Sequence, residues 1–148
     1  MRDLPTDKII SCFYGSSEDC VKVIDCDNTL MSFNPNGLKA MEIDDEKEVL
    51  GKDWLILWNG SFKAKASEAL VKAKKGDLAR FEGYCPTFKG NMKYWEVSIA
   101  PLYNEFKEIS WLLVTSHDAT KQKDLEQLVD SQKLEIESLK AKLMLLPS

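Results

Sequence analysis

The sequence predicts an α+β fold: a five-stranded antiparallel sheet with helices on one face, with an N-terminal helix and a long C-terminal helix expected to form a coiled coil. The predicted order is two strands, several helices and three more strands, whereas a doubly wound parallel fold needs strands and helices to alternate. Aromatic residues are frequent up to Trp111 and absent from Leu112 onward. We therefore expect an amphipathic helix over residues 1–16, a globular domain over 17–120 and a helical tail over 121–148.

Composition describes one domain with an extension. The chain has 148 residues, 44% of them hydrophobic and 30% charged, which suffices for a core without disulfides or metals. A net charge of −4 argues against nucleic acid as a partner. No apolar run reaches the ~18 residues of a membrane span, so we expect no membrane insertion. The N-terminus shows no signal-peptide pattern, which predicts a cytoplasmic protein.

Reactive side chains form no recognisable constellation. Cys12, Cys20, Cys26 and Cys85 contain no C-x-x-C pair and have no histidine cluster nearby, so we expect reduced thiols and no metal. No Ser-His-Asp, Cys-His or paired-carboxylate arrangement is visible, and the single histidine leaves few options for a general base. We therefore expect a protein that is not an enzyme.

The first half of the domain is predicted as a helix, a hairpin and a second helix. Val and Lys alternate over 20–24, as in a strand, and turn residues over 25–28 lead into a second strand over 29–33. Asn34 followed by Pro35 predicts a helix start, because Asn accepts hydrogen bonds at the N-cap and Pro suits the first helical position. The preceding helix is expected from Thr6 or Asp7 to about Tyr14.

The second half is predicted as a long helix and three strands. Residues 53–58 form a very apolar segment that we expect to be buried. Asn59 or Ser61 begins a helix with apolar residues on one face, and Gly76 closes it. Strands are then expected over 78–85, 93–103 and 109–117.

Five short segments, taken in their order along the chain, indicate the fold family. They are the hairpin residues Ile24, Asp25, Asp27 and Leu30, and the segments FNPNGLKAM (33–41), EVLGKDW (48–54), FEGYCPTFKGNMKYWEVSIAPL (81–102) and VTSHDATKQKDLEQ (114–127). Together, over about residues 17–124, they resemble a PAS domain of the bacterial sensory type. The resemblance implies a sensor in signal transduction, with a histidine kinase of a two-component system or another signalling enzyme downstream.

Departures from the chromophore-binding branches of that family narrow the expected cofactors. Residues 52–61 contain no Cys, unlike the flavin photoreceptors, and residues 62–75 contain no His or Cys to serve as an axial haem ligand. Ala119 stands where the family often has Ile. Covalent flavin and haem are therefore disfavoured, and an unknown small organic ligand is expected instead.

Alternation along the strands predicts an interior face. Trp95, Val97 and Ile99 share one face of their strand, and by resemblance Ser116 faces a ligand. Gly83 is expected to leave open space beside Trp95 or to mark a bulge. No basic residue falls on this interior set, so we expect an apolar or aromatic ligand. The candidate cavity residues are Trp54, Trp58, Phe81, Gly83, Cys85, Trp95, Val97, Val114 and Ser116. A filled core in which the aromatics pack on each other is the alternative.

The opposite face and the tail predict association. Trp111 and Leu113, with Tyr94 and Ala100, form an apolar patch that the N-terminal helix or a second subunit would cover. The tail fits a heptad pattern typical of a parallel homodimeric coiled coil. The predicted dimer and coiled-coil residues are Trp111, Leu113, Leu125, Val129, Gln132, Ile136, Leu139 and Leu143. A single helix that packs back on its own sheet is the alternative.

The junction between the last strand and the tail is the predicted relay. We expect Asp118 to accept hydrogen bonds there and Thr120 to cap the tail helix, with His117 beside them. A ligand would then bias the two helices between arrangements. The alternative is a ligand-free PAS module for protein–protein interaction and dimerisation.

Overall fold

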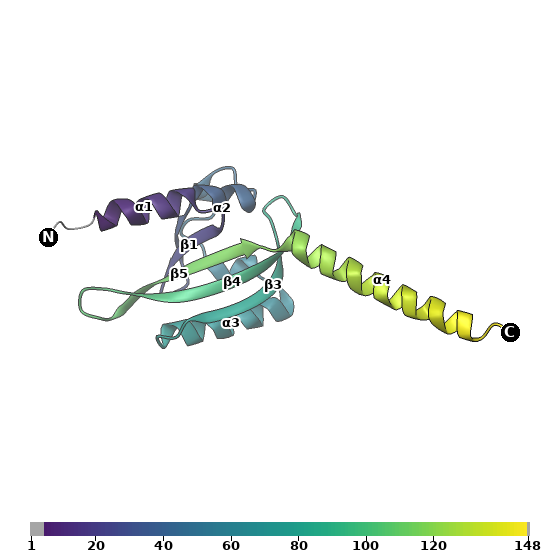
Figure 1. The fold of residues 1–148 in the computed structure, drawn as a ribbon. Coiled ribbons are helices and arrows are strands. Elements are labelled where there is room, and N and C mark those ends of the chain that lie inside the picture. Colours follow the sequence, from purple (N-terminus) through teal and green to yellow (C-terminus); the bar gives the residue numbers. More distant parts are fainter. Residues whose placement is uncertain (1–4, 148) are drawn as a thin grey trace. The chain divides into compact units, whose positions relative to one another are not determined.

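The computed structural model describes residues 5–147, which form two compact units divided between Asp118 and Ala119. The first unit contains a five-stranded antiparallel sheet in the order β2-β1-β5-β4-β3 (Figure 1), which confirms the predicted fold class. The strands are β1 (Cys20–Asp25), β2 (Leu30–Phe33), β3 (Ala79–Pro86), β4 (Met92–Tyr103) and β5 (Ile109–Asp118). The last strand therefore lies at the centre, between β1 and β4.

Helices occupy the connection between β2 and β3 and the two ends of the chain. They are α1 (Thr6–Ser16), α2 (Pro35–Ala40), the 3-10 turns η1 (Glu46–Glu48) and η2 (Trp54–Leu57), α3 (Gly60–Lys74) and α4 (Thr120–Met144). The helix α3 packs on β3 and β4 (Figure 1), through buried residues at helical spacing such as Ala66, Leu70 and Ala73. Gly90 turns the chain between β3 and β4 with a φ of +86°, a conformation that favours glycine.

Cross-strand pairs align the interior residues in rows across the sheet. Cys20 pairs with Ser116, Ser116 with Val97, and Val97 with Phe81, so these four residues form one row across β1, β5, β4 and β3. The adjacent row is Lys22, Val114, Ile99 and Ala79. Because side chains alternate along a strand, both rows face the helices. The predicted interior residues Trp95, Val97, Ile99, Leu112, Val114 and Ser116 are all buried.

A buried asparagine holds the corner between β2 and α2. The Oδ1 atom of Asn34 accepts hydrogen bonds from the backbone N–H of Gly37 and of Val21, each at 2.9 Å. Its Nδ2 atom donates to the carbonyls of Tyr14 and Asp19, at 3.1 and 2.9 Å. The predicted N-cap is therefore confirmed, and the same side chain also joins α1, β1 and α2.

One local prediction is wrong. Residues 53–58 are not buried throughout, because Ile56 is 55% exposed. The segment folds as the 3-10 turn η2, whose three residues per turn send successive side chains in different directions.

Of the two candidates for covering the outer face of the sheet, the structure excludes the N-terminal helix. α1 packs beside α2, Trp111 is 43% exposed, and Phe13 of α1 is 72% exposed. Cover by a second subunit stays a prediction.

The second unit is a single helix. α4 runs without a break for 25 residues, and none of them is buried. The predicted heptad residues Leu125, Val129, Ile136, Leu139 and Leu143 are exposed, and their spacing places them along one stripe of the helix. Association through this stripe stays a prediction.

Candidate ligand-binding interior

Lys22 on β1 lies inside the domain. Its side chain is only 3% exposed, because Cys20, Lys22 and Ile24 alternate with Val21 and Val23 and share the face toward the helices. The sequence-based expectation that the interior contains no basic residue is therefore wrong. The alternation was visible in the sequence, and placing the apolar Ile24 inward would also have placed Lys22 inward.

The surroundings of the Lys22 ammonium group are polar but uncharged. Its Nζ atom donates to the Ser116 hydroxyl at 3.0 Å and to the Cys20 sulfur at 3.4 Å. It also lies 5.5 Å from the centroid of the Phe33 ring. Among the residues that the structure describes, no ion pair involves Lys22. Burial of an ammonium group without a counter-ion costs several kcal/mol, so this position favours the approach of an anion.

Three aromatic rings form another part of the interior. The rings of Trp58 and Phe81 meet edge to face with centroids 5.0 Å apart, and Trp54 lies 5.9 Å from Trp58 and 6.3 Å from Phe81. Within the described part of the chain, the buried indole N–H groups of both tryptophans lack a hydrogen-bond acceptor. By contrast, the Trp95 indole donates to the Cys85 carbonyl at 3.3 Å. Because buried donors are almost always paired, Trp54 and Trp58 have unused binding capacity.

The space beside Gly83 is filled. A Cβ atom at this position would lie 2.6 Å from Phe62 Cδ1 and 3.2 Å from a ring carbon of Trp58. The pairing of β3 with β4 is also regular through Gly83, so there is no bulge. Both sequence-based interpretations of Gly83 are therefore wrong: the glycine permits close packing of aromatic rings, contributed by α3 and by the residue after η2.

Cys85 closes the interior at the end of β3. Its thiol donates to the Leu57 carbonyl at 2.8 Å, and burial raises its pKa to about 11. Lys22 lowers that pKa to a smaller extent, which places the ammonium charge within electrostatic range of this thiol. The thiol is therefore protonated and acts as a donor.

Thiol reactivity tests this description of the four cysteines. Cys12 and Cys26 are exposed, whereas Cys20 and Cys85 are buried. A disulfide reagent such as Ellman's reagent should modify the first two quickly in the native protein and the second two only after denaturation, because attack needs an accessible thiolate. Single Cys→Ser variants assign each phase. Rapid native modification of Cys85 would contradict its placement.

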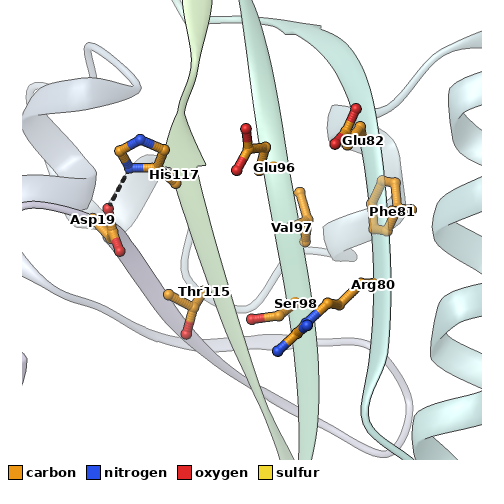
Figure 2. Close-up of a pocket in the computed structure, with 9 residues that line it drawn as sticks. All are labelled: Asp19, Arg80, Phe81, Glu82, Glu96, Val97, Ser98, Thr115 and His117. Atoms are coloured by element: carbon orange, nitrogen blue, oxygen red, sulfur yellow. Dashed lines mark hydrogen bonds and ion pairs between the residues drawn. The ribbon is translucent and has the colours of Figure 1, made fainter.

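The outer face of the sheet carries a hollow of about 490 Å³. Figure 2 shows its residues on β3, β4 and β5 together with Asp19, which comes just before β1 and is joined to His117 by a hydrogen bond of 2.9 Å. The hollow also contains Arg80, Glu82 and Glu96. Three carboxylates thus face one guanidinium and one imidazole, a charge balance that disfavours anions.

His117 should titrate above its ordinary range. Its hydrogen bond to Asp19 raises its pKa, assisted by the charges of Asp19, Glu96 and Asp118 and opposed by desolvation. A raised folded-state pKa means that the pairing stabilises the fold fully below the unfolded-state pKa of about 6.5. That contribution is lost as pH rises through the folded-state pKa.

An NMR titration of this single histidine measures the effect. Asp19→Asn should lower the pKa of His117 toward its ordinary value, because the accepting carboxylate is removed. Asp44→Asn, at an exposed carboxylate that pairs with Lys89 on the surface, is the matched control and should leave the pKa of His117 unchanged. An unshifted titration in Asp19→Asn would show that the pairing is absent in solution.

The last residues of β5 contact both the buried interior and the surface of the domain. Ser116 faces Lys22, while Asp118, two residues later, lies 3.4 Å from Lys93 of β4 in an ion pair. Lys93 also donates to the Ala40 carbonyl at 2.7 Å, so the strand end is tied to α2. The expected cap at Thr120 is wrong by one residue: Ala119 is the N-cap of α4 and Thr120 its first residue, because β5 extends to Asp118.

The remaining candidate residues are placed by the sheet. Val97 and Val114 are buried on β4 and β5, and Leu113 is half-buried on the outer face.

Among residues 5–147, no cluster of His, Cys, Asp or Glu has the grouping of a metal site. No helix in that same range has the length and hydropathy to cross a membrane.

A five-stranded antiparallel sheet with the order 2-1-5-4-3, helices across one face and a helix after the central last strand defines a class of sensory and interaction domains. The family model described as the PAS fold matches residues 14–124. The chain belongs to the PAS family. Domains of this family are in general sensory or interaction modules.

Solved structures agree on the fold. An RNA-binding Light-Oxygen-Voltage receptor is similar with a TM-score of 0.71 at 18% identity, over 89% of this chain and 40% of that chain. A PAS domain from Colwellia psychrerythraea has a TM-score of 0.70 at 17% identity, over 78% of this chain and 98% of that one. A domain of a sensory box sensor histidine kinase/response regulator from Geobacter sulfurreducens has a TM-score of 0.65 at 20% identity, over 76% and 94%. A search of curated proteins returned no match.

Proposed function

We propose that this chain is a sensory PAS module that binds a small organic ligand between sheet and helices and relays binding into α4. The observation that carries the proposal is on β5. This strand contributes Ser116 to the polar contacts of Lys22 and, two residues later, Asp118 to the ion pair with Lys93. A ligand that draws Lys22 away from Ser116 would change the contacts of the strand immediately before α4 begins.

The output of this module is proposed from the family and from α4. Sensor histidine kinases contain domains of this fold, so a histidine kinase or another signalling enzyme is the proposed effector. Parallel pairing of two α4 helices through Leu125, Val129, Ile136, Leu139 and Leu143 would make the module a homodimer. Gln132 in the same seam would fix the register at some cost in stability.

Ligand binding is tested on the purified protein. Native mass spectrometry should detect a bound small molecule, or a thermal-shift screen of a metabolite library should find compounds that raise Tm, because a ligand that binds only the folded state stabilises it. An absorbance spectrum without visible bands is expected, since we propose neither haem nor covalent flavin. A sample without bound compound whose Tm responds to no library member would contradict the proposal.

The relay is tested with α4 fused to its effector. Asp118→Ala should change ligand-dependent output, because it removes the ion pair with Lys93 at the strand end. The control Asp44→Ala removes an exposed ion pair with Lys89 and should leave output unchanged. Unchanged output in Asp118→Ala would rule out this relay.

The second candidate is a ligand-free interaction and dimerisation module. The specific observation in its favour is the contact of Trp54, Trp58 and Phe81 with one another, together with Phe62 in the space beside Gly83. A ligand-free module does not explain why the indole N–H groups of Trp54 and Trp58 lack acceptors among the described residues. Nor does it explain why the Lys22 ammonium group is buried with neutral acceptors. That difference favours the sensory function.

A further inference from the structure

We infer that the ligand of this interior is a small monocarboxylate with an aromatic or apolar body, and that Lys22 is its counter-ion. The inference rests on the proposed function and specifies its ligand class. Neither the chain's acidic composition nor the sequence pattern pointed to an anion. The assignment comes from the charge balance and the donors that the fold places inside.

Charge balance limits the ligand to one negative charge. Among the described residues, Lys22 is the one charged side chain in the buried core, which otherwise contains the polar residues Asn34, Thr87 and Ser116. Asn34 already makes four hydrogen bonds within the protein. One ammonium group neutralises one carboxylate, whereas a phosphate or dicarboxylate would leave a second charge uncompensated in a dry interior.

Two donors meet at the proposed carboxylate position. Lys22 Nζ and Ser116 Oγ lie 3.0 Å apart, so a carboxylate that enters beside them can accept from both. Among the described residues, the Ser116 hydroxyl is the oxygen that accepts from the Lys22 ammonium group. A carboxylate is a much stronger acceptor than a hydroxyl, because charge-assisted hydrogen bonds are about twice as strong as neutral ones. A ligand with a neutral amide in place of the carboxylate lacks this advantage.

The aromatic rings define the other end of the ligand. The row Ser116, Val97, Phe81 runs from the ammonium group to the ring cluster. Two strand spacings separate Ser116 from Phe81, which is about 10 Å. Phe81 contacts Trp54 and Trp58, whose indole N–H groups lack acceptors in the described structure. A body of one or two rings has about the length of this row and would enter by displacing the packed rings, and a hydroxyl or carbonyl oxygen on it would accept from an indole.

The outer hollow is a poor alternative for the same ligand. It combines Asp19, Glu82 and Glu96 with Arg80 and His117, so its carboxylates outnumber its cations (Figure 2). It also lies on the face of the sheet opposite Lys22. Anion binding is therefore expected in the interior.

The test compares matched acids and amides on residues 1–148. The probes are benzoate, phenylacetate, hydrocinnamate and indoleacetate, each beside its amide, measured by thermal shift and by isothermal calorimetry. At least one acid should raise Tm by about 10 °C at roughly 100 times its Kd. The matching amide should bind at least about 10-fold more weakly, the loss expected for one charge-assisted hydrogen bond.

Variants separate the interior site from surface binding. Lys22→Met keeps an unbranched side chain that is one heavy atom shorter, removes the charge and should weaken acid binding by about 10- to 100-fold while amide binding changes little. Lys63→Met removes an exposed charge on α3 and should bind the acids as the natural protein does. Acid binding that survives Lys22→Met would overturn the inference.

The outcomes distinguish this inference from the proposed function. Equal binding of acids and amides, or binding of neutral members of the general library alone, overturns the carboxylate assignment and supports a ligand site. If no acid binds but neutral compounds do, the carboxylate assignment is likewise overturned and a ligand site is supported. Failure of all probes and of the whole library overturns both.

Discussion

Replacing Lys22 with methionine should raise the free energy of unfolding of the ligand-free protein by about 1–4 kcal/mol, the range found when buried charged groups give way to apolar side chains of similar volume. The physical reason is that Lys22 is only 3% exposed and that, among the described residues, its ammonium group contacts a hydroxyl, a thiol and an aromatic ring but no carboxylate. Chemical denaturation of both proteins measures the difference.

Two controls make this result specific. Lys63→Met changes the same side chain on the exposed surface of α3 and should alter stability by no more than about 0.5 kcal/mol. Lys22→Ala removes the charge and also leaves a void, so it should be less stable than Lys22→Met. Destabilisation by Lys22→Met would show that the ammonium group has a strong partner in solution. A gain in stability combined with loss of acid binding would identify Lys22 as a residue retained for function.

Replacing Asn34 with alanine should lower the free energy of unfolding by about 3–5 kcal/mol. The loss combines a helix cap at the Gly37 N–H worth about 1 kcal/mol, about 1–3 kcal/mol for the buried Val21 N–H left unpaired, and about 0.5 kcal/mol for each of the two part-buried bonds to backbone carbonyls. The groups concerned are the N–H groups of Val21 and Gly37 and the carbonyls of Tyr14 and Asp19. Urea unfolding provides the measurement.

Asn36, two residues later, offers a matched comparison. Its Nδ2 atom donates to the Glu18 carbonyl near the surface, where water can replace the bond. Asn36→Ala should therefore cost only about 0.5–1 kcal/mol. A similarly small cost for Asn34→Ala would show that α1 and β1 are not held through this corner.

Much of the fold followed from local patterns. The Asn34-Pro35 helix start and the alternation of Trp95, Val97 and Ile99 on β4 each depend on neighbouring residues, and each has the structure that the sequence predicts. The boundary predicted between residues 120 and 121 lies two residues after the division between the two compact units, which falls between Asp118 and Ala119. Local rules suffice where a backbone conformation and its apolar side are determined within a few residues.

The interior was predicted less well because its content depends on distant elements. Gly83 appeared to leave space, but Phe62 of α3 and Trp58 occupy it. Ile56 appeared buried, but the 3-10 turn directs it outward. Lys22 was overlooked because lysine is rarely buried, although it shares a strand face with the apolar Ile24.

The sequence by itself determined a predicted α+β domain of about 120 residues followed by an aromatic-free helix, and with them the family resemblance. Only the tertiary structure decided that the interior contains an ammonium group beside Ser116 and two unpaired indoles. The physical reason is the distance along the chain over which each effect acts. Periodicity and turn chemistry act over a few neighbouring residues, whereas Lys22 and Ser116 are 94 positions apart and meet only when β1 pairs with β5.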